Sequence, residues 1–496
     1  MILALQFLFR AAGGVLALLL LSAACAGAPP GTGGPPAGHV VLVSIDALRP
    51  EFYLDAAYPA PTLRALAARG AYACAMEPVF PSVTYPDHTS IVTGVRPTAH
   101  GVPFNTVFDP TATSASWYEE ASALKATPLW EWARAAGLKT ASVSWPVTAG
   151  ASIDLLLAER NYYARRDALD ALTASATPGL FDLTRVAPDE TMFRDIVRWD
   201  TFLAATAAAL IREARPNLLL LHLVQADYFQ HRGGRDGADV KPAVARLDVH
   251  IAELLGALDT AGLSERTVVI VTGDHGFQDY EQAVSPNEVL ARAGLRGCPA
   301  LGDGWRATAH VSGAAAGVFV STASGADGTV GAADGTVGAA DGTVASPART
   351  VASPAPTAAS APTAPTVASA PPEDAARRAE RALRDAGEGR YTIVTRAELD
   401  RLGAMPGAAF ALEAAPGWTL DGSCGRGLTR QTFGGTHGFL PSRPPMATGF
   451  IAAGPGIRPG VAIERARLID VAPTIARLLG VSTPAVEGRV LDEILK

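Results

Sequence analysis

Three short, continuous apolar runs are the clearest pattern in the chain, at residues 39–45, 218–224 and 267–272. Runs of this length without polar alternation are typical of strands buried on both faces of a parallel sheet. Residues 243–261 space their apolar side chains as a helix does, and residues 470–479 predict a further helix. Alternating strands and helices indicate an α/β fold, whose central, mostly parallel β-sheet we expect to be flanked by helices on both faces.

Aspartate and histidine residues follow the predicted strands. Asp46 follows the first strand, Asp227 and His231 follow the second, and Asp274 and His275 follow the third. The carboxyl ends of parallel strands meet at one rim of the sheet, where open α/β sheets bind ligands. We therefore expect these three aspartates and two histidines to lie close together.

A sixth residue of this kind is His437, within the glycine-rich segment 434–438, which we interpret as a tight turn. Carboxylate oxygens and histidine nitrogens are ligands of zinc. Two clusters of three such ligands would form a two-metal site, which suits phosphoryl transfer. Any one of these residues alone could be a helix cap or a hydrogen-bonded core histidine. Their coincidence after three strands favours the metal site.

Residues 80–88 offer a nucleophile. Pro86 suits the first turn of a helix, so Thr84 would lie near a helix N-terminus, where free amides and the helix dipole favour an anion. A threonine hydroxyl becomes a competent nucleophile when a metal lowers its pKa. The alternative is that Thr84 only caps the helix. Asn105 could donate a hydrogen bond to a non-bridging phosphate oxygen.

Five motifs together resemble a known family. VSIDALRP, PVFPSVTYPDHTSIVTGVRPTAHGV, the D-x-x-x-H of Asp227 and His231, GDHG and GGTHG occur in the order seen in nucleotide pyrophosphatase/phosphodiesterases, a branch of the alkaline phosphatase superfamily. The resemblance covers residues 39–322 and 373–496, and it implies an alkaline phosphatase-like fold.

Residue by residue, the resemblance implies a site with two Zn²⁺ ions. Asp227, His231 and His437 would hold one ion, and a second set of three would hold the other, namely Asp46, Asp274 and His275. Thr84 would contact the metals and form a covalent phospho- or nucleotidyl-threonine. Its backbone amide and Asn105 would hold the remaining phosphate oxygen, and water would release the product.

The substrate implied is a small phosphodiester or a nucleotide, with Tyr85, Asn105 and Trp145 in contact with it. Threonine-type phosphomonoesterases of the superfamily add a Lys and an Arg that bind a dianionic phosphate, whereas Trp145 lies in the segment VSWPVT, which contains neither. Diester cleavage is therefore favoured. His222 stands where the family often has a tyrosine that stacks on the nucleobase, so nucleotide preference stays open.

Other readings are weaker. The nearest alternative is an alkaline phosphatase-like monoesterase, in which a basic side chain such as Arg160, Arg165 or Arg166 would have to reach the phosphate. A catalytically dead member that binds a phosphorylated ligand would have lost a ligand or the nucleophile, and all are present. A purely structural lipoprotein would not explain the placement of the six ligand-type residues.

The first residues indicate export. Residues 1–24 have the pattern of a signal peptide, and residues 25–38 that of a flexible Pro/Gly-rich tether. The sequence LSAAC resembles a bacterial lipobox, although Ser22 stands where leucine is usual, so Cys25 is a candidate for lipidation and membrane attachment. We expect a periplasmic protein or outer-membrane lipoprotein, or otherwise a secreted protein with a plain signal peptide.

Composition narrows the picture further. The net charge is 41 − 48 = −7, which argues against a nucleic-acid coat protein. Four cysteines in 496 residues, with no CxxC pair, exclude a disulfide-built scaffold and a zinc ribbon. Cys298 and Cys424 could pair in an oxidising compartment, whereas Cys74 lies in an apolar segment that predicts a buried thiol. The sequence makes no prediction of oligomeric state.

Residues 323–372 differ from the rest. The unit ADGTVGA occurs twice in succession and ADGTV follows, and then a Pro/Ala/Ser/Thr tract runs to Pro372. This composition cannot bury enough apolar surface to offset the entropy of ordering. We interpret it as a disordered surface insertion in a single, discontinuous catalytic domain formed by residues 39–322 and 373–496.

Overall fold

The computed structural model describes residues 37–110, 116–302, 304–321 and 372–496. The predicted signal peptide, Cys25 and nearly all of the tether lie outside the described residues. So does the predicted insertion, except for Pro372, where a helix begins. No helix within the described ranges is long and apolar enough to cross a membrane.

The largest sheet contains all three predicted strands, with β1 between β5 and β6 in parallel pairing. β14 pairs antiparallel with β2 and β6, and the other described pairings in this sheet are parallel. This confirms the predicted fold class. In order, the strands are β15 (Val461–Ile463), β2 (Ala71–Glu77), β14 (Thr448–Ala453), β6 (Thr267–Thr272), β1 (His39–Ile45), β5 (Leu218–Leu223), β3 (Thr140–Val143) and β4 (Leu155–Leu157), with β16 (Ala466–Arg467) on β2.

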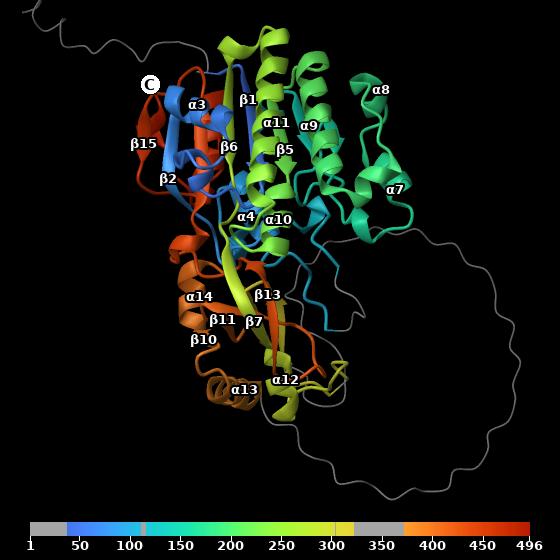
Figure 1. The fold of residues 1–496 in the computed structure, drawn as a ribbon, viewed down its shortest axis with the longest axis vertical. Helices are drawn as coiled ribbons and strands as arrows, with labels where there is room; N and C mark the ends of the chain where they lie inside the picture. The colour runs from blue at the N-terminus through green and yellow to red at the C-terminus, as the bar shows by residue number, and fades with distance from the viewer. Residues whose placement is uncertain (1–36, 111–115, 303, 322–371) are drawn as a thin grey trace, which may run out of the picture. The chain divides into compact units, whose positions relative to one another are not determined.

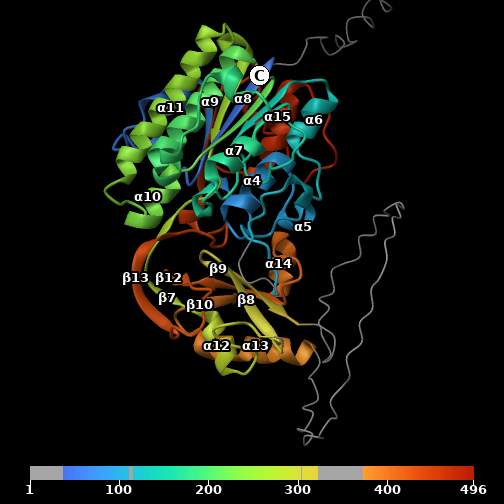
Figure 2. The same cartoon turned by 90° about the vertical axis from the view of Figure 1, so that its right-hand side faces the viewer.

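Helices cover both faces of this sheet (Figure 2). Successive side chains of a strand point to opposite faces, and in β1 Val41 and Val43 pack in one core while Val40 and Leu42 pack in the other. The first core includes α3 (Pro61–Arg69), α9 (Ile196–Glu213) and α11 (Val240–Thr260). The second includes α4 (Thr84–Thr93), α6 (Leu129–Ala135) and α15 (Val471–Leu479). This two-sided burial explains why the strands are continuously apolar.

The α-helices include both predicted ones, the first as α11 (Figure 1) and the second as α15 (Figure 2). Their bounds are α2 (Glu51–Leu54), α3 (Pro61–Arg69), α4 (Thr84–Thr93), α5 (Pro97–His100), α6 (Leu129–Ala135), α7 (Ala168–Ser175), α8 (Leu180–Thr184), α9 (Ile196–Glu213), α10 (Gln225–Gly233), α11 (Val240–Thr260), α12 (Pro286–Arg292), α13 (Pro372–Ala386), α14 (Arg396–Leu402) and α15 (Val471–Leu479).

Two smaller sheets, which the sequence pattern did not predict, complete the described fold. One has the order β10-β11-β9-β8 and the other β12-β7-β13. Their strands are β7 (Gln278–Val284), β8 (Ala307–Ser312), β9 (Ala315–Val320), β10 (Tyr391–Val394), β11 (Phe410–Ala414), β12 (Gly417–Leu420) and β13 (Thr429–Thr436). α12 and α13 pack against the four-stranded sheet around a separate apolar core.

The cysteines follow the sequence prediction only in part. Cys298 and Cys424 form a disulfide, as anticipated. Cys74, however, is a free and exposed cysteine, so the prediction of a buried thiol was wrong. The physical reason is the alternation of β2, in which Ala71 and Ala73 face the core and Cys74 points the other way.

Candidate active site

The ends of three neighbouring strands bring five of the six predicted ligands together. β1 is in register with both neighbours at Ser44, which lies opposite His222 of β5 and Thr272 of β6. Asp46 follows β1 directly, and Asp274 and His275 follow β6 after one glycine. After β5 the chain enters α10, which carries the other two, Asp227 and His231, one helical turn apart.

His437 is supplied from the three-stranded sheet. Gly434, Gly435 and Thr436 lie in β13 rather than in a tight turn, so that part of the prediction was wrong. β13 passes very close to α10, since a Cβ atom added at Gly435 would lie 2.5 Å from the Gln230 carbonyl oxygen. The glycines therefore allow the strand to deliver His437 beside His231.

One group of ligand atoms surrounds Asp227. The Nε2 atom of His231 lies 3.3 Å from Asp227 Oδ1 and 3.2 Å from His437 Nε2. His437 Nε2 is 3.7 Å from the same carboxylate oxygen. Asp227, His275 and His437 also offer ligand atoms that lie within 4.8 Å of one another, so His275 stands between this group and the next.

The second group contains Asp46, Asp274 and His275, whose ligand atoms again lie within 4.8 Å of one another. His275 Nε2 is 3.4 Å from Asp46 Oδ1 and 3.3 Å from Asp274 Oδ2. The other oxygen of Asp274 accepts the backbone N–H groups of Ala47 and His275, at 2.9 and 3.0 Å. That carboxylate is thus held by one oxygen and presents the other to the site.

The histidine tautomers fit a metal site. The Nδ1 atoms of His231, His275 and His437 lie 2.9, 3.2 and 3.0 Å from the backbone carbonyl oxygens of Gly435, Gly276 and Ser82. A carbonyl only accepts, so each Nδ1 carries a proton, and in the neutral imidazole Nε2 then keeps its lone pair. Protein-bound metals are commonly held by imidazoles oriented in this way.

Unpartnered polar atoms point to the same conclusion. Asp46 Oδ1, Asp227 Oδ1, Asp274 Oδ2 and His275 Nε2 are buried without a hydrogen-bond partner among the described residues. Burial and the nearby Asp227 carboxylate raise the pKa of Asp46 to about 7. Burial and the Asp46 carboxylate likewise raise the pKa of Asp274 well above its usual range. Divalent cations would satisfy these atoms and offset the negative charge, so the residues fit the implied zinc ions.

Thr84 is the first residue of α4, and the N-cap is Val83, so Thr84 is not a cap. The segment around it is fixed to both ligand groups. Two residues earlier, the Ser82 carbonyl accepts from His437, and four residues later His88 Nδ1 lies 3.5 Å from Asp274 Oδ2. Thr84 is partly exposed between these anchors, at a helix N-terminus whose dipole favours an anion.

Asn105 is oriented toward the same helix N-terminus. Its Oδ1 atom accepts the backbone N–H of Tyr85 at 2.9 Å. The hydrogen atoms on Nδ2 are therefore the donors with which this side chain can bind an anion. The structure thus places Asn105 beside the residue that follows Thr84.

The two aromatic residues expected at the substrate lie deeper. Tyr85 is 2% exposed, and burial together with a hydrogen bond to Glu159 raises the pKa of its hydroxyl well above its usual range. Trp145 is 0% exposed and packs edge-on against His88. The exposed aromatic surface beside Tyr85 belongs to Trp117, with ring centroids 5.2 Å apart, and no sequence pattern had indicated a role for Trp117.

His222 and Glu159 are further polar residues at the site that sequence reasoning did not assign a role. His222 lies 3.2 Å from Asp46 Oδ2 through Nε2 and 2.7 Å from Glu159 Oε2 through Nδ1. Burial alone would lower the pKa of His222, but the Glu159 and Asp46 carboxylates raise it well above its usual range. A single histidine inside an apolar strand has no spacing pattern that could have revealed this contact.

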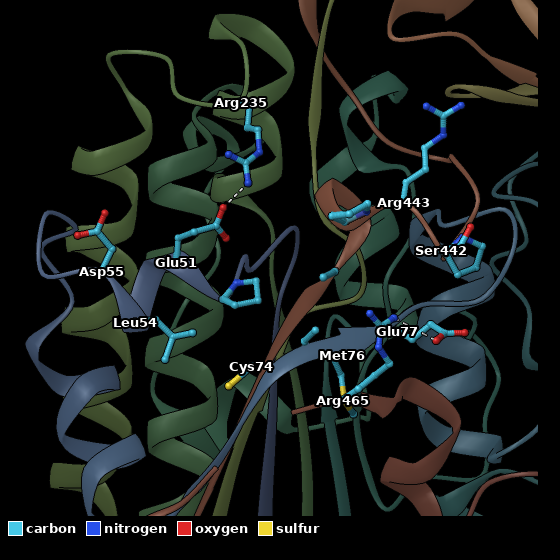
Figure 3. Close-up of a pocket in the computed structure, with 15 residues that line it drawn as sticks. Glu51, Leu54, Asp55, Cys74, Met76, Glu77, Arg235, Ser442, Arg443 and Arg465 are labelled. Carbon is cyan, nitrogen blue, oxygen red and sulfur yellow. Dashed lines mark hydrogen bonds and ion pairs between the residues drawn. The ribbon is translucent and has the colours of Figure 1, made fainter. Parts of the chain in front are cut away.

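A cavity of about 480 Å³ lies apart from all of these residues (Figure 3). Its lining includes the exposed Cys74, and three arginines, each of which already has an acidic partner. Arg235 pairs with Glu51, Arg443 with Glu413 and Arg465 with Glu77. The cavity shares no lining residue with the ligand cluster.

Comparison with known proteins agrees with this geometry. Residues 40–440 match the family model described as type I phosphodiesterase/nucleotide pyrophosphatase. Human ectonucleotide pyrophosphatase/phosphodiesterase family member 1 is 25% identical over 262 residues, or 50% of this chain and 24% of the human protein. An uncharacterised pyrophosphatase/phosphodiesterase of Schizosaccharomyces pombe is 27% identical over 251 residues, or 48% of this chain and 44% of that protein. The match spans less than half the length of either relative.

Solved structures share the fold over a greater length. Human ectonucleotide pyrophosphatase/phosphodiesterase 5 has a TM-score of 0.61 at 18% identity, covering 92% of this chain and 100% of that one. The murine protein, in an inactive form in complex with AMP, has a TM-score of 0.62 at the same identity and coverage. From the family match and this fold, the chain belongs to the type I phosphodiesterase/nucleotide pyrophosphatase family.

Proposed function

We propose that the protein is a zinc-dependent hydrolase that cleaves phosphodiester or pyrophosphate bonds, with nucleotide-type substrates, through a covalent intermediate on Thr84. The observation that carries the proposal is the convergence of unpartnered Asp and His ligand atoms beside a threonine at a helix N-terminus. Family membership and the AMP complex of the murine relative support the nucleotide class.

We assign the six ligand residues to two zinc ions as the family resemblance implies. Asp46, Asp274 and His275 would hold one, and the other would be held by Asp227, His231 and His437. When bound, two such ions stabilise negative charge on phosphoryl oxygens and lower the pKa of the attacking hydroxyl. The position of His275 within reach of both groups supports a shared site rather than two separate ones.

In the proposed reaction, Thr84 Oγ1 attacks phosphorus in line with the leaving group. The Oγ1–P bond forms as the bond from phosphorus to the leaving oxygen breaks, the hydroxyl proton passes to solvent and the leaving oxygen takes up a proton. Asn105 Nδ2 and the backbone N–H of Thr84 hold a non-bridging oxygen. Water then attacks phosphorus, breaks the Oγ1–P bond and restores the Thr84 hydroxyl.

A preference for diesters follows from the cations near the site. The segment that contains Trp145 is buried and supplies no basic side chain. Arg160 already pairs with Glu119 at 3.0 Å and with Glu120 at 2.8 Å. Arg165 pairs with Asp167. Arg160 and Arg165, two of the three candidate arginines for a monoesterase, are therefore already paired with carboxylates and would have to leave them to bind a dianionic monoester.

The test compares kcat/KM for bis-p-nitrophenyl phosphate, or a nucleotide p-nitrophenyl ester, with that for p-nitrophenyl phosphate at matched zinc. One missing charge-assisted contact costs roughly 1.5–3 kcal/mol, so the diester should win by about ten- to a hundredfold. A faster monoester would favour the alkaline phosphatase-like alternative. Retention of full activity in a persistent chelator would exclude the zinc-dependent reaction.

Thr84→Ala tests the nucleophile. The variant is expected to lose covalent labelling by substrate and to lower turnover by at least about 1000-fold, with zinc content still near two per chain. Thr93→Ala is the matched control, because Thr93 belongs to the same helix and its hydroxyl donates to the Thr89 carbonyl. Labelling that persists in Thr84→Ala but disappears in another variant would assign the nucleophile elsewhere.

We further propose that the protein works outside the cytoplasm, as a periplasmic or secreted protein or as a lipoprotein attached through Cys25. The Cys298–Cys424 disulfide supports an oxidising compartment. The name of the human relative, an ectonucleotide pyrophosphatase/phosphodiesterase, agrees with this location. Mass spectrometry of the membrane-associated protein would identify a lipidated Cys25, or its absence.

A further inference from the structure

His222 is held between two carboxylates beside the proposed zinc site. Its side chain is 1% exposed, compared with 5% for Asp46 and 15% for Glu159. Nδ1 lies 2.7 Å from Glu159 Oε2, and Nε2 lies 3.2 Å from Asp46 Oδ2. Glu159 follows β4 and His222 lies on β5, so two strands that are not neighbours in the sheet supply this pair.

The contact with His222 gives the two carboxylate oxygens of Asp46 different surroundings. Oδ2 faces His222, whereas Oδ1 lies 3.4 Å from His275 Nε2 and has no hydrogen-bond partner among the described residues. Asp274 shows the same division, but there two backbone amides hold the outer oxygen. At Asp46 a side chain performs the task that the backbone performs at Asp274.

Glu159 in turn fixes the imidazole. Its short hydrogen bond to Nδ1 sets the ring orientation, so that Nε2 points to Asp46. Groups that orient a metal ligand in this way typically change metal affinity by about 10- to 100-fold when they are removed.

We propose that Glu159 and His222 form a positioning pair that holds Asp46 with Oδ1 toward the zinc ion shared with Asp274 and His275. The inference rests on the proposed zinc-dependent function. In this role, neither residue contacts the substrate. The consequence is that one of the two zinc ions should depend on Glu159 although Glu159 does not bind it.

Glu159→Gln is the sharpest test, because it removes the charge and keeps the shape of the side chain. Zinc affinity is measured by titrating the metal-free full-length protein in competition with a chromophoric chelator. We expect the variant to bind one zinc ion about 10- to 100-fold more weakly than the wild type and the other unchanged. Turnover should fall at limiting zinc and recover at saturating zinc.

Glu253→Gln is the matched control. Glu253 lies 3.1 Å from His250 Nδ1 on α11, a second His–Glu pair that does not involve the ligand cluster. This variant should bind both zinc ions as the wild type does. The melting temperature of each metal-free variant is compared with that of the metal-free wild type, which separates loss of metal from loss of fold.

His222→Phe keeps a buried ring and removes both donors, and His222→Gln keeps one donor that can reach Asp46. If Glu159→Gln fails to fold, the two His222 variants test the positioning role instead. His222→Gln should then retain more zinc affinity than His222→Phe. Wild-type affinity for both ions in Glu159→Gln and His222→Phe would overturn the positioning role. A wild-type protein that binds no zinc would instead overturn the proposed function on which it rests.

Discussion

At the scale of single residues, His100 shows how the burial of one side chain makes the stability of the fold depend on pH. It is 0% exposed, Nε2 lies 3.0 Å from Ser90 Oγ and Nδ1 accepts the Val102 N–H. Burial lowers the pKa of His100 from 6.5 to about 3. The unfolded chain therefore binds a proton that the folded chain does not, and stability is lost as pH falls from 6.5 towards 3.

His100→Asn removes this titration. Each pH unit below 6.5 should cost the wild type about 1.4 kcal/mol relative to the variant, or about 2 kcal/mol at pH 5. Urea unfolding at pH 7 and pH 5, with chelator present throughout so that metal release does not contribute, measures the difference. Parallel pH dependences in the two proteins would show that His100 does not carry the effect.

The same scale shows what a sequence can reveal about a site. Asp46 and Asp274 were predictable because residues that follow parallel strands meet at one rim. The contacts of His222 with Asp46 and with Glu159 were not predicted, because they depend on the order of the strands in the sheet. Cys74 was misjudged because composition indicates an apolar segment but not which face each side chain occupies.

At the scale of elements, the close approach of β13 to α10 positions His437. A Cβ atom at Gly435 would lie 2.5 Å from the Gln230 carbonyl oxygen and 2.7 Å from the Phe277 ring. Gly435→Ala should therefore lower the free energy of unfolding by about 1–3 kcal/mol and weaken zinc binding, since β13 must move away from His231.

Gly256→Ala is the contrasting substitution. Gly256 lies within α11, and a Cβ atom there meets nothing within 4 Å. Alanine favours the helix over glycine by about 0.8–1 kcal/mol, so this variant should be more stable than the wild type and keep its zinc affinity. Denaturant unfolding and zinc titration of both variants provide the measurement. Equal stability of the two would argue against the close approach at β13.

Elements differ in how well the sequence predicts them. β1, β5 and β6 were recognisable because burial on both faces gives each strand a run of consecutive apolar residues. The smaller sheets were not, because strands such as β7 and β13 are partly exposed and contain no run of apolar residues. β11 pairs with β9 across residues 322–371, and β12 pairs with β7 although more than a hundred residues separate them. Local patterns do not specify such partners.

At the scale of the whole molecule, we predict that a short Gly/Ser linker can replace residues 323–371. β9 and α13, which flank the segment, pack in one apolar core, so a linker has only a short span to close. The melting temperature should stay within a few degrees of the wild-type value, and kcat/KM should be unchanged. A large fall in either would mean that the segment contacts the folded part or the active site.

The Cys298–Cys424 disulfide also gives the chain a covalent topology. The bond joins positions 126 residues apart, so the polymer is a closed ring with one tail on each side. A single backbone cut between residues 299 and 423 opens the ring but leaves one covalent molecule, with both ligand groups still on connected chain. The repeat-containing stretch lies inside the ring. One backbone cut there leaves the two fragments joined through the disulfide until it is reduced.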